Sequence, residues 1–333
     1  MTETITESVL EARDLTKHFH VRRGLRPRST VHAVENVSLA LPRSSVTAVV
    51  GESGSGKSTL ARMLARIITP TSGELLLDGQ RTPTGQRHRQ AYAGRVQLVL
   101  QDPFASLNPV HSIRYHLARP LKIHNLAGDD LDEAMEGLLR RVALDPPSRF
   151  IDKYPHELSG GQRQRVAIAR ALAVQPDVLL ADEPVSMLDV SIRVGLLNLM
   201  AQLRDTEGVS FLYITHDLAS ARYVADLLMV MYAGQIAETG PTEEVLARPK
   251  HPYTQLLLTA VPDPRAPLDV SAKAEVGEPP KVIDPQPGCR FRWRCPLAID
   301  KCQTETPPLR ELLPRHQAAC HVARADEEVR AFG

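Results

Sequence analysis

The sequence predicts an α/β fold in which buried parallel β-strands lead into a phosphate-binding loop. Three largely apolar runs, Val46–Val50, Val178–Ala181 and Val209–Thr215, have the composition of strands that are covered on both faces. The stretch Gly51–Ser58 follows the first run and matches G-x-x-x-x-G-K-[ST], and helix-forming residues begin at Thr59. This order of strand, loop and helix is the one that the motif requires.

The phosphate loop supplies the first set of predicted ligand-binding residues. Its glycines let successive backbone N–H groups point at a polyphosphate, and the N-terminus of the following helix adds partial positive charge. Lys57 is expected to reach the β- and γ-phosphates, and Ser58 is expected to offer its hydroxyl to Mg²⁺. The predicted nucleotide-binding residues of this stretch are Gly51, Ser53, Gly54, Ser55, Gly56, Lys57, Ser58 and Thr59.

Composition limits the classes of partner. The 333 residues carry a net charge of +1, so no overall field attracts nucleic acid or anionic lipid. No apolar run approaches the roughly 20 residues that a bilayer span needs, and the stretch from Met1 to Thr4 lacks the basic and apolar regions of a signal peptide. We therefore expect a cytoplasmic protein, whose membrane role would depend on partner proteins.

Two outer strands and a helical insertion accompany this core. Residues 9–19 are expected to form an edge strand that ends at Phe19, whose ring either stacks on an adenine or packs against its neighbours. Val34–Leu39 has the alternation of a second outer strand. Between Ser112 and about Ala143 apolar residues recur at helical spacing, interrupted by Pro and Gly, which predicts an inserted helical subdomain.

Polar residues follow three of the predicted parallel strands, and they are Gln101, the pair Asp182 and Glu183, and His216. Because such sheets bind ligands at the carboxyl ends of their strands, we expect all four side chains near the nucleotide. Asp182 would hold Mg²⁺ through its water shell, and Glu183 would polarise a water molecule for in-line attack on the γ-phosphorus. His216 is expected to contact the γ-phosphate.

A second glycine loop, Leu158–Gln162, precedes a predicted helix. Ser159 is a good N-cap residue, so Gly160 and Gly161 lie against a helix N-terminus. This is a second anion-binding device in the same chain. One nucleotide cannot easily occupy both loops unless they face each other, so the second loop is expected to serve the nucleotide of another subunit.

Together these residues resemble the nucleotide-binding subunits of ABC transporters. The motifs of that family occur in its order: Walker A at Gly51–Ser58, the Q-loop at Gln101, the signature at Leu158–Gln162, the Walker B pair at Asp182 and Glu183, the D-loop at Ser186–Asp189 and the switch histidine at His216, with Phe19 at the adenine-stacking position. The resemblance implies a P-loop NTPase core of the ABC ATPase type with an antiparallel β edge subdomain. It also implies a nucleotide-binding domain at 1–255, with its helical subdomain at about 102–165, and a small cysteine-containing C-terminal extension at 256–333.

The resemblance also implies a mechanism. Two subunits would form a sandwich dimer that binds two ATP molecules, each between one subunit's Walker A loop and the other's signature loop. Of the motif residues, the family assigns catalytic roles to Lys57, Gln101, Glu183 and His216, Mg²⁺ ligation to Ser58, Gln101 and Asp182, and further nucleotide contacts to Ser159, Gly160, Gly161, Gln162 and Asp189.

Three further stretches look like the oligopeptide/dipeptide/nickel importer branch of the family, and these are Gln101–Pro109, Tyr154–Glu157 and His251–Thr254. Glu183–Ser186 and Phe104–Ser106 are similar to the second of the two paired ATPases of that branch, so we expect a heterodimer with a homologous ATPase.

The branch implies import of peptides, or alternatively nickel, at the cytoplasmic face of the membrane. The implied partners are two permease subunits and, indirectly, an extracytoplasmic solute-binding protein. Met187 departs from the alanine that is usual in the D-loop.

The four cysteines, Cys289, Cys295, Cys302 and Cys320, all lie near the end of the chain, after a Pro-rich linker from Val261 to Pro287. Four thiolates suit tetrahedral zinc or a [4Fe-4S] cluster, but the paired C-x₂-C spacing of structural zinc is absent. Some members of the importer branch hold an iron-sulfur cluster with a similar set, so we expect a cluster, and zinc and free thiols remain as alternatives. We expect the site to be a structural staple outside the core sheet and distant from the phosphate loop.

A second functional class is a soluble ABC ATPase of DNA repair or ribosome function, with the cluster as a redox sensor. Long coiled-coil insertions would favour repair, and a tandem second cassette would favour the ribosome class. The sequence contains neither feature, so the importer ATPase is the preferred hypothesis.

Overall fold

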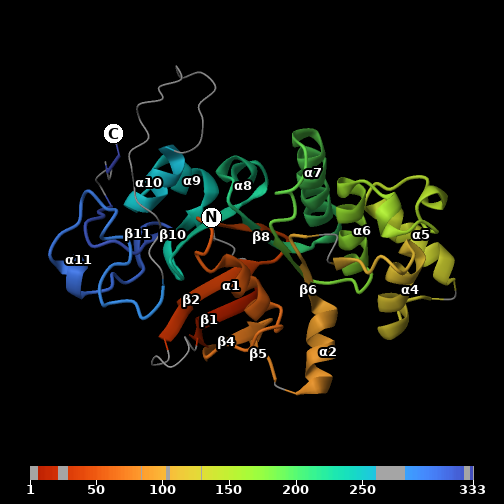
Figure 1. The fold of residues 1–333 in the computed structure, drawn as a ribbon, viewed down its shortest axis with the longest axis horizontal. Helices are drawn as coiled ribbons and strands as arrows, with labels where there is room; N and C mark the ends of the chain where they lie inside the picture. Colours follow the sequence, from red (N-terminus) through yellow and green to blue (C-terminus); the bar gives the residue numbers. More distant parts are fainter. Residues whose placement is uncertain are drawn as a thin grey trace.

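Two β-sheets and the helices around them form the part of the chain that the structure describes (Figure 1). This computed structural model describes residues 7–21, 29–83, 85–102, 106–128, 130–259, 282–325 and 331–332. The strands are β1 (Ser8–Val21), β2 (Ser29–Pro42), β3 (Val46–Val50), β4 (Ser72–Leu77), β5 (Gln80–Arg81), β6 (Val96–Val99), β7 (Val178–Asp182), β8 (Ser210–Thr215), β9 (Leu227–Tyr232), β10 (Gln235–Pro241), β11 (Arg310–Leu313) and β12 (His316–Ala318). The helices are α1 (Lys57–Leu64), α2 (Gln86–Arg95), α4 (Ile113–Ile123), α5 (Leu131–Arg141), α6 (Gly160–Leu172), α7 (Val190–Glu207), α8 (Leu218–Val224), α9 (Thr242–Ala247), α10 (Pro252–Thr259) and α11 (Lys301–Thr304), with short 3₁₀ turns at Pro147–Arg149 and Pro155–Glu157.

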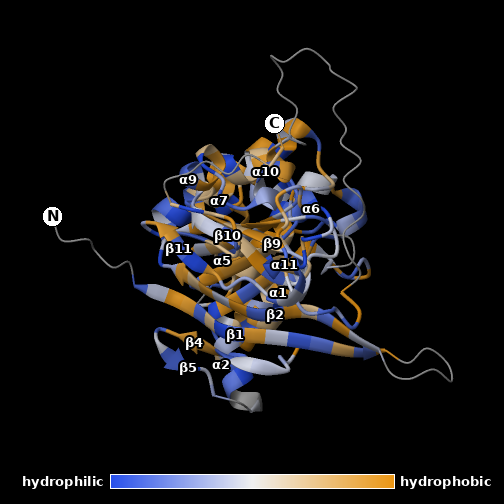
Figure 2. Ribbon diagram, turned by 90° about the vertical axis from the view of Figure 1, so that its left-hand side faces the viewer, coloured by the Kyte–Doolittle hydropathy of each residue, from blue (hydrophilic) through white to orange (hydrophobic). Residues whose placement is uncertain are grey.

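The larger sheet has the strand order β11-β12-β10-β9-β3-β8-β7-β6. From β9 to β6 neighbouring strands run parallel, and every residue of β3, β7 and β8 is buried. In Figure 2 hydrophobic residues gather on the central strands of this sheet, whereas β5, which belongs to the smaller sheet, is hydrophilic. The prediction of parallel strands covered on both faces is confirmed, and their carboxyl ends meet at one edge of the sheet.

The smaller sheet is antiparallel and has the order β2-β1-β4-β5. The prediction that residues 9–19 form an edge strand is wrong, because β1 pairs with β2 on one side and with β4 on the other. Alternation along a strand reports which face is buried, but it does not report how many neighbours the strand has. Helix α1 shares one hydrophobic core with both sheets, so its start is held firmly at the end of β3.

A helical region lies beside the β6 end of the larger sheet (Figure 1). Helices α4, α5 and α6 contribute their apolar faces to the main hydrophobic core. Helix α5 begins after Asp130, whose carboxylate accepts hydrogen bonds from the N–H groups of Asp132 and Glu133. The helical spacing between Ser112 and Ala143 is thus confirmed, and the bounds 102–165 of a subdomain stay a prediction.

The C-terminal extension contributes two strands to the larger sheet, whereas the four cysteines, whose site was predicted to lie outside the core sheet, fall in none of its strands. β12 pairs antiparallel with β10, and β11 pairs with β12. β12 covers hydrogen-bonding groups of β10 that an edge strand would expose. His316 of β12 is fully buried, and its Nε2 lies 2.7 Å from Oε1 of the equally buried Glu238 of β10. β11 and β12 have only four and three residues, and strands this short do not show an alternation of apolar and polar residues that would reveal them in the sequence.

None of the helices in the described residues is long and apolar enough to span a bilayer. The predicted linker from Val261 to Pro287 falls largely outside those residues, as do Pro103–Ala105 of the stretch Gln101–Pro109.

Candidate functional site

The phosphate loop runs from the end of β3 to the start of α1. Gly51, Gly54 and Gly56 have φ angles of +152°, +78° and +103°, a region that side chains rarely tolerate. A Cβ atom on Gly51 would lie 2.2 Å from the carbonyl oxygen of Met231 in β9, and one on Gly56 would lie 2.3 Å from that of Ala33 in β2. The glycines are therefore needed both for the curl of the loop and for its close packing.

Lys57 opens α1, and its ammonium group lies inside the loop. Its Nζ donates to the backbone oxygens of Gly51 and Glu52 at 2.7 and 2.8 Å and to Oγ of Ser55 at 3.3 Å. Burial lowers the pKa of Lys57, and nearby carboxylates, that of Glu183 foremost, oppose this shift. The positive charge is thus held where the loop would cradle a polyphosphate.

Ser58 and Asp182 form a pair of oxygen ligands beside the loop. Ser58 Oγ donates to Asp182 Oδ1 at 2.9 Å and so joins α1 to the end of β7. Burial raises the pKa of Asp182, and the hydrogen bond from Ser58 opposes the shift. A hydroxyl and a carboxylate oxygen are the hard ligands that Mg²⁺ prefers, so these residues fit the predicted ion.

Three predicted catalytic residues meet at one carboxylate group. Glu183 follows β7 with a φ angle of +46°, and its N–H donates to the carbonyl oxygen of Ile214 in β8 at 3.0 Å. Gln101 Nε2 donates to Glu183 Oε2 at 3.0 Å, and His216 Nδ1 lies 3.3 Å from the same oxygen. A carboxylate held in this way can accept a proton from a water molecule.

The other residues predicted to contact the nucleotide in the first half of the chain are more varied in exposure. Ser53 and Gly54 are exposed, and Thr59 is half-buried in α1. Phe19 lies in β1 with its ring partly exposed, and the Lys17 ammonium is 5.1 Å from the ring centroid. An open ring face is available for stacking, and the adenine contact stays a prediction.

The second glycine loop forms a capping box at the start of α6. The N–H of Gln162 donates to Ser159 Oγ at 3.3 Å, and the N–H of Ser159 donates to Gln162 Oε1 at 3.0 Å. Gly160 is half-buried. A Cβ atom on Gly161 would lie 2.4 Å from Cγ2 of Ile192, so Gly161 permits the close approach of α6 and α7. Figure 1 shows α6 beside α4 and α5, so the two glycine loops begin helices that stand apart in the fold.

The D-loop joins β7 to α7 directly after Glu183. Ser186 Oγ donates to the carbonyl oxygen of Glu183 at 3.0 Å. Asp189 is exposed and precedes α7 without a side-chain capping bond. Next to it, Met187 and Val190 are 64 % and 74 % exposed. Large apolar side chains that lie close together and are exposed to solvent beside a site are typical of a protein–protein contact surface.

The four cysteines lie near one another in the extension. Burial raises the pKa values of Cys289 and Cys295 to about 11, and Cys302 and Cys320 add to both shifts through their charge. Backbone N–H groups point at three of the sulfurs, from Phe291 and Arg292 to Cys289, from Leu297 to Cys295, and from Val322 and Ala323 to Cys320. These donors favour the thiolate, which is the form that binds metal, and so oppose the effect of burial in part.

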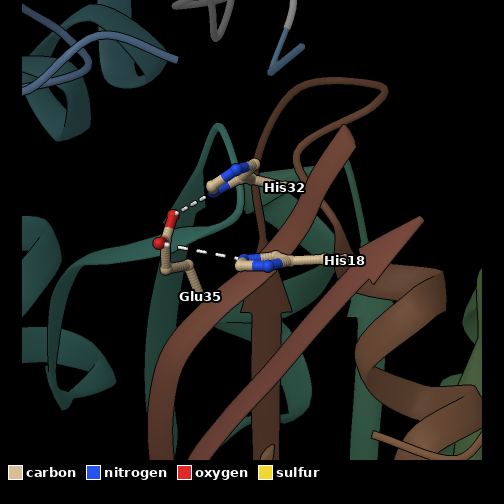
Figure 3. Close-up of side chains that lie close together, drawn as sticks. All are labelled: His18, His32 and Glu35. Carbon is tan, nitrogen blue, oxygen red and sulfur yellow. Dashed lines mark hydrogen bonds and ion pairs between the residues drawn. The ribbon is translucent and has the colours of Figure 1, made fainter. Parts of the chain in front are cut away.

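Two histidines of the β1–β2 hairpin point at Glu35 (Figure 3). His18 Nε2 and His32 Nδ1 lie 3.9 and 3.0 Å from its carboxylate oxygens, and the three ligand atoms lie within 4.8 Å of one another. Arg290 of the extension pairs with the same carboxylate through Nη2. A guanidinium on the carboxylate competes with a cation, so we assign no metal to this group and interpret it as an attachment of the extension to the hairpin.

Two residues outside the predicted site contact the phosphate loop at Glu52. Arg294 Nη1 and Nη2 donate to its two carboxylate oxygens at 2.7 and 2.8 Å, and the N–H of Glu52 donates to Tyr253 Oη at 2.8 Å. The prediction that the four-cysteine site is distant from the phosphate loop is therefore wrong, because Arg294 is the neighbour of Cys295 in the chain. No local pattern signals the contact, because Arg294 and Glu52 are 242 positions apart and single charged residues are mostly solvated.

Comparisons with known proteins define the class. Residues 34–186 match the family described as ABC transporter, and residues 237–302 match the one described as oligopeptide/dipeptide transporter, C-terminal region. The structure of cbiO1 from Clostridium perfringens, part of the ABC transporter complex cbiONQ, is similar with a TM-score of 0.64 at 27 % identity, over 72 % of this chain and 91 % of that chain. The dimeric structure of MJ0796, a bacterial ABC transporter cassette, has a TM-score of 0.61 at 27 % identity, over 70 % and 98 %. The fold and the site are those of an ABC-type ATPase.

Sequence relatives narrow the class. The di/tripeptide transport ATP-binding protein DppF of Pseudomonas aeruginosa (strain UCBPP-PA14) is 46 % identical over 325 residues, which are 95 % of this chain and 98 % of that protein. The oligopeptide transport ATP-binding protein AppF of Bacillus subtilis (strain 168) is 42 % identical over 329 residues, 97 % and 99 % of the two chains. The chain therefore belongs to the ABC transporter ATP-binding proteins, in the group that carries the oligopeptide/dipeptide transporter C-terminal region, and it is an ATPase.

Proposed function

We propose that the protein is the ATP-hydrolysing subunit that energises import of peptides across the cytoplasmic membrane through partner membrane subunits. The observation that carries the proposal is the meeting of Gln101 and His216 at the Glu183 carboxylate, next to the Ser58–Asp182 pair. It combines a proton acceptor with residues suited to a triphosphate and its cation. The names of the relatives supply the solute class, and nickel is the alternative solute.

Each residue of the site has a separate task in this proposal. The N–H groups of the phosphate loop and Lys57 bind the β- and γ-phosphates, and Ser58, Gln101 and Asp182 hold Mg²⁺, which offsets phosphate charge when bound. Glu183 accepts a proton from the attacking water, and His216 holds the γ-phosphate in line. Phe19 stacks on the adenine.

The site would be completed by a second subunit. We assign contacts with the partner's nucleotide to residues at the starts of α6 and α7, namely Ser159, Gly160, Gly161, Gln162 and Asp189. In support, α6 lies beside α4 and α5 and away from α1 in Figure 1, and Met187 and Val190 are exposed at the start of α7. The similar cassette MJ0796 is described as dimeric. We propose that the partner is a second, homologous ATPase.

The helical region would bind the membrane-spanning subunits. Val110, Tyr115 and Tyr154 are exposed large hydrophobic residues in or near α4, which is the composition expected of a contact surface. We propose two permease subunits at this surface, on the cytoplasmic face of the membrane, and a solute-binding protein on the other side. We also propose residues 1–255 as the nucleotide-binding domain and 256–333 as the extension, although β12 of the extension pairs with β10 of the nucleotide-binding domain.

Reconstitution with the membrane proteins encoded beside this chain tests the function. We expect the chain to copurify with them and to drive ATP-dependent uptake of a labelled di- or tripeptide into vesicles. A complex that carries Lys57→Ala should assemble but take up no peptide. Uptake of nickel and not of peptide would change the solute, and recovery of the chain with DNA or ribosomes and without membrane proteins would overturn the proposal.

We further propose that Cys289, Cys295, Cys302 and Cys320 hold a [4Fe-4S] cluster. In support, the charges of Cys302 and Cys320 act on both Cys289 and Cys295, so the four thiols lie near one another. Four thiolates suit a cluster, and the resemblance to the importer branch favours it over zinc. The cluster would act as a staple for an extension with few strands of its own.

Anaerobic purification tests the cluster. The protein should be brown and contain about four iron and four sulfide ions per chain, and Cys302→Ser should bleach it. Colourless protein with one zinc per chain would replace the cluster by zinc. Four thiols that react with an alkylating agent in the native protein would remove the metal centre altogether.

A further inference from the structure

We propose that Arg294 is a positioning residue of the phosphate loop, through which the C-terminal extension sets the affinity for the nucleotide. The inference rests on the proposed function of the loop as the ATP site. Arg294 precedes Cys295 in the extension, and Glu52 is the second residue of the loop. Two parallel hydrogen bonds join them, Nη1 to Oε2 at 2.7 Å and Nη2 to Oε1 at 2.8 Å. A two-point ion pair of this kind fixes orientation as well as position.

Aromatic side chains hold the guanidinium of Arg294 in place. Its central carbon lies 5.7 Å from the ring centroid of Tyr232 and 5.8 Å from that of Phe291. Nη1 also lies 3.3 Å from Tyr232 Oη, and the side chain is only 8 % exposed. Because its surroundings fix the arginine, the arginine can in turn fix the loop.

The backbone of Glu52 is held from other directions. Its N–H donates to Tyr253 Oη at 2.8 Å, and its carbonyl oxygen accepts from Lys57 Nζ at 2.8 Å. The neighbouring residues Ser53 and Gly54 belong to the stretch whose N–H groups would bind phosphate. A shift of Glu52 would therefore displace these groups from the positions that a phosphate requires.

Arg294 also neutralises a carboxylate in the phosphate-binding region. The negative charge of Glu52 is among those that act on the Lys57 ammonium. It therefore contributes to the electrostatic potential where the phosphates would bind. The Glu52 side chain is 27 % exposed, and without Arg294 its unpaired charge would repel a triphosphate. This effect can be separated from mere attachment of the extension, because a Glu52→Gln change removes the charge without restoring the attachment.

Affinity for a non-hydrolysable ATP analogue with Mg²⁺, measured on the full chain by titration calorimetry, tests the proposal. Arg294→Ala is expected to weaken binding about tenfold. Arg294→Lys keeps the charge but loses the two-point geometry, so its affinity should be intermediate. The double variant Arg294→Ala with Glu52→Gln should recover part of the affinity, because the unpaired carboxylate is gone while the loop still lacks the contact that orients it. A purely structural role would give no such recovery.

Arg290→Ala is the matched control. Arg290 is also a buried arginine of the extension, but it pairs with Glu35 of β2 instead of the loop, so its loss should change affinity by less than about threefold. Thermal denaturation of each variant verifies that it is folded. Parent affinity in Arg294→Ala, an equal loss in Arg290→Ala, or a double variant no tighter than Arg294→Ala would overturn the proposal.

Lys57→Ala separates this inference from the proposed function. If both Arg294→Ala and Lys57→Ala bound the analogue as tightly as the parent, the loop would not be the ATP site, and both proposals would fail. If Lys57→Ala lost binding while Arg294→Ala did not, only the role of Arg294 would fail.

Discussion

Among single residues, Glu183 is the group on which hydrolysis should depend most. Its carboxylate accepts a hydrogen bond from Gln101 and faces His216, and its backbone is tied to β8 through Ile214. The side chain is therefore held from the ends of two strands, β6 and β8, and its backbone is fixed by β8 as well. Asp182, one position earlier, accepts a hydrogen bond from Ser58 and has the separate task of holding the ion in the proposed function.

Glu183→Gln is expected to bind ATP as the parent does and to hydrolyse it at least about 100-fold more slowly, because an amide keeps the shape of the carboxylate but cannot accept a proton. Phosphate release from the assembled complex measures the rate. Glu207→Gln is a suitable control, since Glu207 pairs with Arg141 at the other end of α7. A parent rate in Glu183→Gln would show that another group activates the water.

At the scale of elements, helix α10 is attached to the extension by a neutral histidine. His251 precedes α10 and is buried, its Nδ1 accepts the N–H of Tyr253 at 3.0 Å, and the ring also bonds to the backbone of Ala319. Burial lowers the pKa of His251 from 6.5 to about 4. Tyr253 in turn bonds to the phosphate loop at Glu52, so this histidine supports the loop indirectly.

The free energy of unfolding is expected to fall as the pH is lowered from 6.5 towards 4. In that window the unfolded chain binds a proton at His251 that the native chain does not, so the contribution is present above the unfolded pKa and is lost in acid. It amounts to about 2 kcal/mol between pH 7.5 and pH 5. Urea unfolding at the two pH values measures it.

His251→Gln should be less stable than the parent at pH 7.5 but should lose this part of the pH dependence. His124→Gln, which removes a histidine after α4, is the control and should retain the dependence of the parent. The same pH dependence in the parent and in His251→Gln would show that other groups cause it.

For the whole molecule, the main consequence of the fold is that it separates the two glycine loops, which the proposed function assigns to two different nucleotides. The phosphate loop begins α1 and the signature loop begins α6, and Figure 1 shows these helices in different parts of the molecule. The exposed apolar side chains of Met187 and Val190 lie just before α7 and at its first residue. Each feature favours a site that two subunits complete together.

Ser159→Arg is therefore expected to leave nucleotide affinity of the isolated chain within about twofold of the parent and to abolish turnover in the assembled complex. Mixing it with Lys57→Ala would restore one composite site in a homodimer. We expect no restoration, because the proposed partner is a different ATPase. A marked loss of affinity in the monomeric variant would argue that the signature loop acts within its own chain.

The candidate site could be predicted from the sequence because most of its residues directly follow a predicted strand in the chain. A buried apolar run followed by Gly51–Ser58, Asp182–Glu183 or His216 places each group at the carboxyl edge of a parallel sheet. The structure brings Gln101 and His216 to 3.0 and 3.3 Å from the same oxygen of Glu183. The edge position of residues 9–19 was predicted wrongly, because alternation does not reveal the number of neighbours of a strand.

By itself, the sequence determined the parallel core, the sheet edge at which the candidate site lies and the four cysteines of the extension, because patterns of burial and turn residues can be recognised in residues that are close along the chain. Only the tertiary structure decided where the extension lies. The pairing of β12 with β10 and the contact of Arg294 with Glu52 join segments that are far apart in sequence. Such contacts depend on how the whole chain packs, and neither a short strand nor a single arginine carries a local pattern that distinguishes it from a solvated one.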